Sequence, residues 1–292
     1  MTAGFLLIDK EGGWTSHDVV AKARGVLGIR KIGHAGTLDP MATGLLVLGV
    51  GSGTRLLRFV QDAPKTYEAR AQFGVATDTL DADGAVLSRE PMAVTEDEVR
   101  EAAQRFVGTI SQVPPMVSAV KVEGRRLYEL AREGVEVERP ARTVVVDAID
   151  VLDFAPSDYP VLTMRIVCGA GTYVRTLADD IAGALGGRAH LTSLRRTSIG
   201  SLHVDDALGI GEVADADDPA AALVPLSSGL ADLPAVTVDA ETARGVRSGM
   251  VFAASAFSAD IDRPFRVVEE TGRLLAVYAS DGRRAKPEVV VS

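Results

Sequence analysis

Apolar and polar positions along the chain predict several short strands and fewer amphipathic helices. Residues 4–10 (GFLLIDK) and 45–51 (LLVLGVG) are apolar runs of buried-strand length, whereas residues 65–77 alternate with a period of two, as in a half-buried strand. Residues 95–108 (TEDEVREAAQRFVG) begin with a T-x-x-E capping box and repeat apolar residues at helical intervals. The chain therefore contains both kinds of element.

The order of these elements favours an α+β architecture. The predicted strands form hairpin-like neighbours, and helices occur irregularly between them, for example over residues 15–28 and 172–187. A doubly wound fold would need regular alternation, so we expect a mixed, largely antiparallel sheet flanked by helices. Short β-like runs separated by Gly turns then predict a small β domain over residues 229–292, after a first domain over residues 1–228.

Charge is distributed unevenly. The formal charge is -9, but residues 201–242 hold nine acids and no Lys or Arg, so the remainder sums to zero. Residues 21–60 carry six basic side chains against one acid, Asp39, and residues 165–200 carry five against two. An acidic average argues against a nucleic-acid partner, yet these two basic regions leave that class open. A scatter of solvated surface charges would give the same counts.

The sequence does not indicate a disulfide, a metal site, a membrane span or a signal peptide. The single cysteine, Cys168, cannot form an intramolecular disulfide, and the four histidines show no metal-binding spacing. No apolar run is long enough to span a bilayer, and the first residues lack the features of a signal peptide. We therefore expect a cytoplasmic protein without a membrane or metal partner. A monomer is expected because no exposed apolar stripe or heptad is present.

Three features of the chain look like known sites but are better explained structurally. GVGSGTRL, residues 49–56, lacks the GK[ST] of a Walker motif, so we interpret it as a strand-to-helix turn whose backbone N–H groups could touch a phosphate. TLDADGAVLSRE, residues 79–90, resembles a calcium loop, but Thr79 occupies position 1 and the flanks read as strands. We expect a hairpin turn there. Cys168 is expected to be a buried free thiol.

The run GHAGTLDPMATG, residues 33–44, presents the one carboxylate of the first basic region. Pro40 pushes residue 39 towards an extended backbone, and the glycines of the run allow close approach to a ligand. The many cations nearby in sequence favour an ionised Asp39, which suits a nucleophile or an electrostatic anchor more than a general acid. On spacing alone, an Asp-Pro turn acid explains the pattern equally well.

GHAGTLDPMATGLL resembles the signature of the TruB family of tRNA pseudouridine synthases, a G-H-x-G-x-L-D-P-x-A-x-G-x-L run. Further stretches look like family motifs and follow in order from residue 4 to about 205. They are LIDKEGGWTS, KTYEA, TDTLDADG, SAVKVEGRRLYELAREG, GTYVRTLADD and HLTSLRRTSIG. One departure is Glu11, where the family usually has proline. The combination is highly specific.

The resemblance implies a pseudouridine-synthase-type catalytic domain over residues 1–228, with an RNA-gripping insertion at about 115–143, and a PUA-like domain over 229–292. It implies isomerisation of one tRNA uridine, position 55 in the T loop, to pseudouridine. No cofactor or metal is implied, and the partner is the tRNA T arm and loop. The alternative is a tRNA-binding or tRNA-folding factor on the same fold, without chemistry.

The resemblance also implies roles for individual residues. Asp39 would be the nucleophile that forms or supports a covalent adduct, and attack on the base and attack on the sugar carbon both remain open. Tyr67 would stack on the uracil and help the final proton transfer, and Arg175 would pair with Asp39. His34 would support the loop that fills the space left by the extruded base. Further candidates lining the pocket are Lys10, Tyr173 and Leu194.

Overall fold

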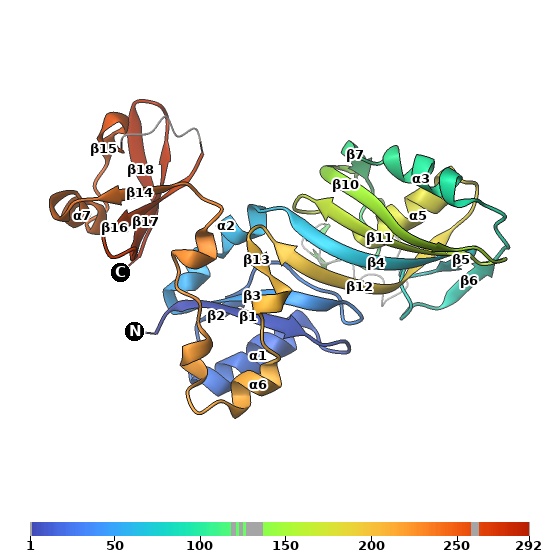
Figure 1. Ribbon diagram of the computed structural model, residues 1–292, viewed down its shortest axis with the longest axis horizontal. Helices are drawn as coiled ribbons and strands as arrows, with labels where there is room; N and C mark the ends of the chain where they lie inside the picture. The colour runs from blue at the N-terminus through green and yellow to red at the C-terminus, as the bar shows by residue number, and fades with distance from the viewer. Residues whose placement is uncertain (1, 118–120, 123–124, 127–136, 258–262, 292) are drawn as a thin grey trace. The chain divides into compact units, whose positions relative to one another are not determined.

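The computed structural model describes residues 2–117, 121–122, 125–126, 137–257 and 263–291 (Figure 1). Contacts among these residues divide the chain into two compact units. The first unit comprises the chain up to Pro40, Gly44–Ala63 and the chain from Ile199 onward, and the second comprises Met41–Thr43 and Pro64–Ser198. The expected RNA-gripping insertion at about 115–143 lies largely outside the described residues.

The first unit begins with three antiparallel strands and a capped helix. Strand β3 lies between β1 and β2, with Leu6 opposite Leu48 and Ile32 opposite Val50. Helix α1 has Thr15 as its N-cap in a capping box and ends at Gly28, whose φ of 64° is left-handed, so the helix predicted over residues 15–28 is confirmed. The elements are β1 (Gly4–Lys10), α1 (Ser16–Leu27), β2 (Ile32–His34), β3 (Thr43–Val50), the 3-10 helix η1 (Gly51–Arg55) and α2 (Leu57–Asp62).

The rest of the first unit contains a small β sheet. Its five strands follow the order β14-β16-β17-β18-β15, in which β14 and β16 are parallel and the other pairs are antiparallel. The bounds are β14 (Ala235–Val238), α7 (Ala240–Arg247), β15 (Phe252–Ala253), β16 (Phe265–Glu269), β17 (Leu274–Ser280) and β18 (Arg284–Val290). The predicted small C-terminal β sheet is confirmed, whereas its boundary at residue 229 stays a prediction.

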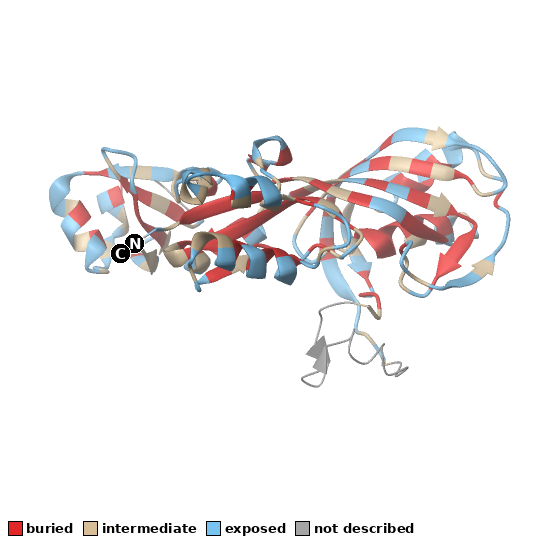
Figure 2. Ribbon diagram, turned by 90° about the horizontal axis from the view of Figure 1, so that it is seen from below, coloured by how far each residue is buried: buried red, intermediate tan, exposed pale blue. Residues whose placement is uncertain are grey.

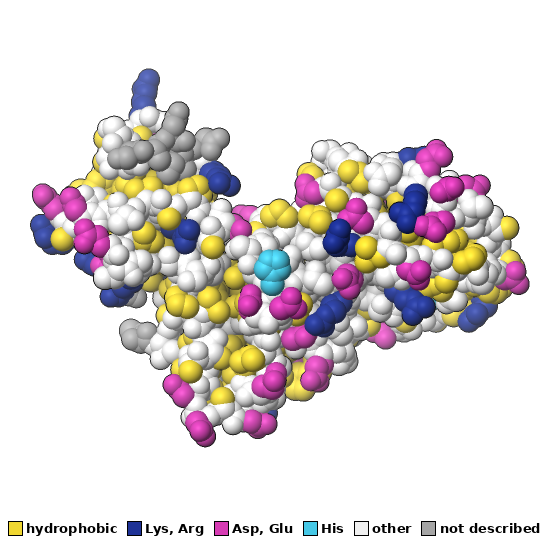
Figure 3. Space-filling model, viewed as in Figure 1, with side chains coloured by type: hydrophobic (Ala, Val, Ile, Leu, Met, Phe, Trp, Pro, Cys, Tyr) yellow, Lys and Arg dark blue, Asp and Glu magenta, His cyan; other side chains and the backbone are white. Residues whose placement is uncertain are grey.

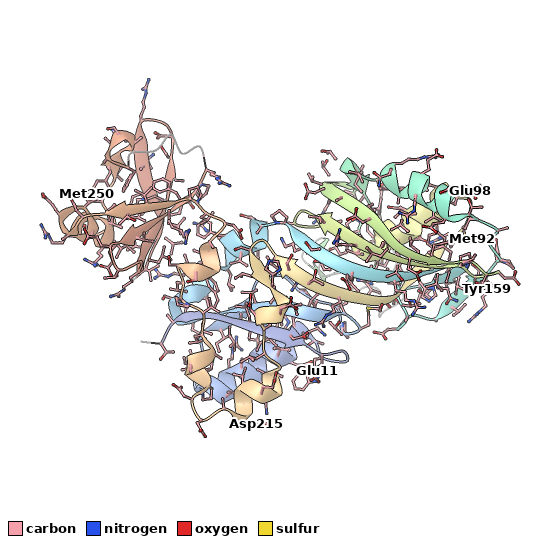
Figure 4. The ribbon with its side chains drawn as sticks, in the orientation of Figure 1. Glu11, Met92, Glu98, Tyr159, Asp215 and Met250 are labelled. Carbon is pink, nitrogen blue, oxygen red and sulfur yellow. The ribbon has the colours of Figure 1, made fainter. Side chains whose placement is uncertain are left out.

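The acid-rich segment is folded rather than extended. It forms β13 (Leu202–His203) and a series of short helices, which are η2 (Val204–Asp206), α6 (Ile210–Asp215), η3 (Pro219–Ala222) and η4 (Ser228–Leu230). Helix α6 lies against α1, and acidic side chains gather over this region in Figure 3, with Asp215 at the end of α6 in Figure 4.

The second unit contains five strands of the nine-stranded sheet, in the order β12-β4-β11-β10-β7. Its registers place Ala69 opposite Met164 and Ile149 opposite Ile166. The elements are β4 (Lys65–Phe73), β5 (Val75–Thr77), β6 (Val86–Arg89), α3 (Glu96–Gln104), β7 (Gly108–Gln112), β8 (Lys121–Val122), β9 (Arg125–Arg126), β10 (Arg142–Ala155), β11 (Val161–Cys168), α5 (Val174–Ala184) and β12 (Ala189–Ile199). Helix α3 contacts β10, and α5 contacts β4. The expected α+β fold with a largely antiparallel sheet is confirmed.

The core of the first unit joins the two ends of the chain. Phe5, Leu45 and Val47 of the first strands pack in one cluster with Leu274 and Val277 of β17. Buried residues line the strands in Figure 2. Because apolar burial stabilises by about 25 cal/mol per Å², the C-terminal sheet contributes directly to the stability of β1 and β3.

Helix α5 carries a carboxyl group whose ionisation opposes folding. Burial raises the pKa of Asp180 to about 6, and the like charge of Asp179 adds to this effect. The folded-state pKa lies above that of an unfolded Asp, so the folded protein binds more protons between about pH 4 and pH 6. Stability is therefore lost as pH rises through this window.

Asp180→Asn should raise the free energy of unfolding at pH 7 by on the order of 1 kcal/mol, after allowance for partial solvent screening. At pH 4, where the carboxyl group is protonated in the folded state and about half protonated in the unfolded state, the gain should be much smaller. Urea unfolding at the two pH values measures this. The exposed Asp153→Asn is the matched control, and an equal gain at both pH values would contradict the assignment.

Candidate active site

The loop that carries Asp39 joins β2 to β3, and Asp39 itself belongs to the first unit. It has no regular secondary structure from residue 35 to residue 42, and Asp39 itself is half-buried. Ala35, Leu38 and Ala42 are buried, at 0%, 3% and 0% exposure. The backbone N–H of Ala35 donates to the carbonyl oxygen of Val47 at 2.8 Å. Buried residues therefore flank Asp39 on both sides in this loop.

A buried serine holds the residue before Asp39. Ser16, the first residue of α1, is 1% exposed. Its hydroxyl oxygen accepts from the backbone N–H of Leu38 at 2.9 Å and donates to the carbonyl oxygen of Leu38 at 3.2 Å. Both polar backbone groups of Leu38 are thus satisfied by one side chain, as burial of this residue requires.

A buried lysine holds the residue after Asp39. Lys10, the last residue of β1, is 1% exposed. Its ammonium group donates to the carbonyl oxygen of Pro40 at 3.3 Å and to those of Glu11 and Trp14 at 2.8 and 2.7 Å. The turn at Glu11, labelled in Figure 4, is therefore held by Lys10 although it lacks the family's usual proline. Together, Lys10 and Ser16 fix both chain neighbours of Asp39.

His34 ends β2 and leads into this loop. Its ring is half-buried and lies edge-on to the ring of His17 of α1, with centroids 5.5 Å apart and planes at 82°. This contact ties the start of the loop to α1. In the first unit, Asp39 thus lies in the loop, His34 lies at its start, and Lys10 contacts it through Pro40.

In the second unit, Arg175 is a buried residue of α5. Its side chain is 3% exposed, and it pairs with Asp81, Nη1 to Oδ2, at 3.1 Å. It also donates to the carbonyl oxygens of Thr79 at 2.7 Å and Val117 at 2.8 Å. The guanidinium of Arg175 is therefore held by partners within the second unit. Its expected pairing with Asp39 stays a prediction.

Asp81 is the residue that sequence reasoning missed. Its Oδ1 accepts from the hydroxyl of Thr79 and, at 3.2 Å, from the backbone N–H of Asp83. Its other carboxylate oxygen, Oδ2, faces Arg175. The preceding Leu80 has a φ of 61°, a left-handed value that is uncommon outside glycine. The turn joins β5 to β6, so the predicted hairpin is confirmed. Its buried acid faces an arginine of the same unit.

The remaining candidates lie on three elements of the second unit. Tyr173 is the N-cap residue of α5, and its backbone N–H and carbonyl oxygen bond to the side chain of Gln112 at 2.8 and 3.1 Å. Gln112 is 2% exposed and was not predicted. Tyr67 is half-buried on β4 opposite Ile166, and Leu194 is buried on β12. Tyr173 and Arg175 therefore come together at the start of α5.

Cys168 has no sign of nucleophilic activation. Burial raises the pKa of its thiol to about 11, so the group is neutral at physiological pH. The interpretation as a buried free thiol is confirmed. Among the described residues, no three His, Cys, Asp or Glu side chains are grouped so as to bind a metal. No helix in the described part of the chain is both long and apolar enough to cross a membrane.

Comparison with known proteins decides the family. A family model described as TruB family pseudouridylate synthase (N terminal domain) matches residues 24–174, more than half of the chain. The chain belongs to the TruB family of pseudouridylate synthases. The tRNA pseudouridine synthase B of Ralstonia nicotianae is 46% identical over 294 residues, covering 99% of this chain and 94% of that protein. The tRNA pseudouridine synthase B of Moorella thermoacetica is 43% identical, covering 97% and 92%.

Solved structures with a similar fold were also found. A chain from a crystal structure of a Cbf5-Nop10-Gar1 complex aligns with a TM-score of 0.77 and 25% identity, covering 100% of this chain and 84% of that chain. A chain from an H/ACA RNP bound to a substrate RNA containing 2'-deoxyuridine aligns with a TM-score of 0.76 and 23% identity, covering 99% and 85%. At that identity the second likeness concerns the fold alone.

The buried pair in this TruB family member should matter for stability far more than an exposed pair. Asp81→Asn leaves the guanidinium of Arg175 without its facing carboxylate in a buried setting, and we expect the free energy of unfolding to fall by about 3 kcal/mol. Urea unfolding followed by circular dichroism measures it.

Asp150→Asn is the matched control for this substitution. Asp150 pairs with Arg165 at 3.0 Å, but the two side chains are 49% and 52% exposed. The same change there should cost less than about 1 kcal/mol. Equal losses in the two variants would show that the Asp81–Arg175 pair is not held in a buried site.

Proposed function

We propose that this protein converts a uridine of tRNA, position 55 in the T loop, to pseudouridine, with Asp39 as the nucleophile. The observation that carries this proposal is the double anchoring of the Asp39 loop by buried Lys10 and Ser16. Such anchoring positions a reactive group before substrate arrives, which lowers the entropic cost of reaction. The named relatives support tRNA as the substrate class.

The chemistry rearranges one base without oxidation or reduction. A uridine stacked in a structured loop must first be extruded from the stack. Asp39 then adds to the base or to the sugar carbon as the bond between N1 and C1' breaks, and the uracil turns. A bond from C5 to C1' forms, the bond to Asp39 breaks and returns its electron pair to the carboxylate, the hydrogen on C5 leaves as a proton, and N1 gains one. No cofactor is needed for this balance.

Residues of the second unit would complete the reaction. In this proposal Arg175 pairs with Asp39 and keeps it ionised, since a neighbouring guanidinium favours the charged carboxylate. Its position is preset because Asp81 and the carbonyl oxygens of Thr79 and Val117 already hold it. Asp81 would thus be a positioning residue that acts through Arg175.

The other candidates would handle the base. Tyr67 would stack on the uracil and assist the final proton transfer, since aromatic rings form platforms for extruded bases. His34 would support the loop that fills the vacated space, and Tyr173 and Leu194 would line the pocket. Lys10 would act by holding the turn and the loop, as its three carbonyl contacts support.

We also propose the domain roles and setting. Residues 1–228 would form the catalytic domain and residues 229–292 a PUA-like domain, with the insertion at about 115–143 gripping the T arm. The protein would act as a monomer in the cytoplasm. The alternative function, a tRNA-binding or tRNA-folding factor, would use the same surfaces without Asp39 chemistry.

Tritium release from unmodified tRNA carrying 5-tritiated uridine tests the proposal, because C5 loses its hydrogen only when the base is rejoined there. Wild type should release tritium, and Asp39→Asn should reduce the rate by at least about 10³-fold, since it removes the nucleophile. Its tRNA affinity should stay within a few-fold. Asp62→Asn, an exposed acid of the same unit, is the matched control and should keep full activity.

Two outcomes would count against the proposal. Undiminished release by Asp39→Asn would remove Asp39 from the chemistry. Tight tRNA binding by wild type without any release would favour the binding factor instead.

A further inference from the structure

A second concave site lies in the first unit. It is a cavity of about 1220 Å³, lined by the loop after α1, the η1 segment, residues 225–227 and the turn before β17. Four of its lining residues are cationic, and none of the described residues that line it is Asp or Glu. The four are Arg30, Lys31, Arg55 and Arg273. The chain as a whole carries -9, so this is a marked local excess of positive charge.

The backbone of the first unit builds this cavity. In the antiparallel pair of β2 and β3, Ile32 lies opposite Val50, so Lys31 and Gly51 follow side by side. The backbone N–H of Gly51 donates to the carbonyl oxygen of Lys31 at 2.9 Å. Lys31 and the η1 segment that ends with Arg55 are therefore fixed against each other.

Two glycines of GVGSGTRL allow the backbone of this segment to pack closely against the first residues of the chain. Gly51 has a φ of 60°, and an added Cβ would lie 2.6 Å from the carbonyl oxygen of Thr2. At Gly53 an added Cβ would lie 2.6 Å from the carbonyl oxygen of Gly4. The interpretation as a strand-to-helix turn is thus favoured. A ligand in the cavity would meet the side chains of Ser52 and Arg55.

The cavity cations differ from nearby arginines of the same unit in their pairing. Arg58 pairs with Glu288, and Arg247 pairs with Glu269 at 2.6 Å. Arg273 only reaches Glu269 at 4.0 Å. Within the described residues, no ion pair with a carboxylate is formed by Arg30, Lys31 or Arg55. Three cations gathered without paired carboxylates, beside a fourth whose pairing is long, favour an anionic ligand.

The apolar residues that line the cavity indicate which kind of anionic ligand would fit. Leu226, Leu274 and Val291 give the cavity an apolar part beside its cations. A phosphate matches the arginines, which bind its oxygens in pairs, and a sugar and base match the apolar part. A nucleotide combines both features in one molecule.

The cavity is separate from the Asp39 loop. That loop joins β3 at Thr43, whereas the cavity lies next to the other end of the strand, after Val50. Eight residues of strand separate the two ends, which corresponds to roughly 25 Å at about 3.4 Å per residue.

We propose that this cavity is a nucleotide-phosphate binding site, additional to the site around Asp39. The phosphate comes either from the backbone of an RNA strand that reaches this end of β3 or from a free nucleoside polyphosphate. The inference goes beyond the proposed function, because it requires no chemistry at Asp39.

The double variant Arg55→Ala/Arg273→Ala tests this site. Arg58→Ala/Arg247→Ala is the matched control, since it removes the same charge from exposed, carboxylate-paired arginines of the same unit outside the cavity lining. Two affinities are measured for wild type and both variants. One is for ATP without divalent metal, by calorimetry, and the other is for full-length unmodified tRNA at several salt concentrations.

Each source of phosphate gives its own result. If RNA supplies it, the salt dependence of tRNA binding becomes shallower by about 1.4 to 1.8 in the cavity variant, at about 0.7 to 0.9 per lost phosphate contact, and not in the control. If a free nucleotide supplies it, wild type and control bind ATP and the cavity variant binds at least 10-fold more weakly. Tritium release is read separately, so failure of the Asp39 proposal would not affect either result.

Equal behaviour of the cavity variant and the control with both ligands would overturn the proposal. Thermal unfolding confirms that both variants fold, which is expected because the substituted side chains are exposed. A second cavity variant, Arg30→Gln/Lys31→Gln, should show the same loss as the first.

Discussion

The Asp39 loop depends on the hydrogen bonds that the buried ammonium group of Lys10 donates. A cation that is 1% exposed is costly to bury unless several oxygens surround it. Here carbonyl oxygens from the Glu11 turn and from Pro40 face it, so the end of β1, the start of α1 and the loop are held at one point. Loosening that point would release the loop from one of its two anchors.

The second unit also buries a cation among fixed partners, but here one of those partners is a carboxylate. The pair of Arg175 and Asp81 is buried, and such pairs often add little net stability compared with apolar residues of similar size. Their use is better understood as fixing one orientation of a guanidinium. The hydroxyl of Thr79 and the backbone of Asp83 fix the carboxylate in turn. In both units, burying a charged side chain costs folding free energy and fixes the position of that group, as is common at functional sites.

Much of the fold followed from the sequence because the signals were local. Helix α1 has its capping box and terminal glycine, and the strands of both sheets show their apolar patterns. Helix α7 was missed because it has only eight residues among short β-like runs. A local signal was nevertheless present, because the N-cap residue Asp239 accepts from the backbone N–H of Thr242.

The site was predictable only in part. The motif around Asp39 is contiguous, so its Pro and Gly residues could be interpreted directly. Asp81 stands in a turn with Asp78 and Asp83, and nothing local distinguishes the acid that becomes buried. Gln112 was missed for the same reason, since its bonds to Tyr173 join residues 61 apart in the chain. Long-range burial and pairing are set by tertiary packing, which a single sequence does not display.

The shared core of the first unit has a consequence for biosynthesis. Phe5 and Leu45 leave the ribosome well before their core partners Leu274 and Val277, which lie more than 200 residues further along the chain. At about 5 to 20 residues per second, the first strands wait roughly 11 to 54 s for those partners. During that interval their apolar side chains must be shielded in some other way. Until Leu274 and Val277 emerge, the core of the first unit is incomplete in the nascent chain.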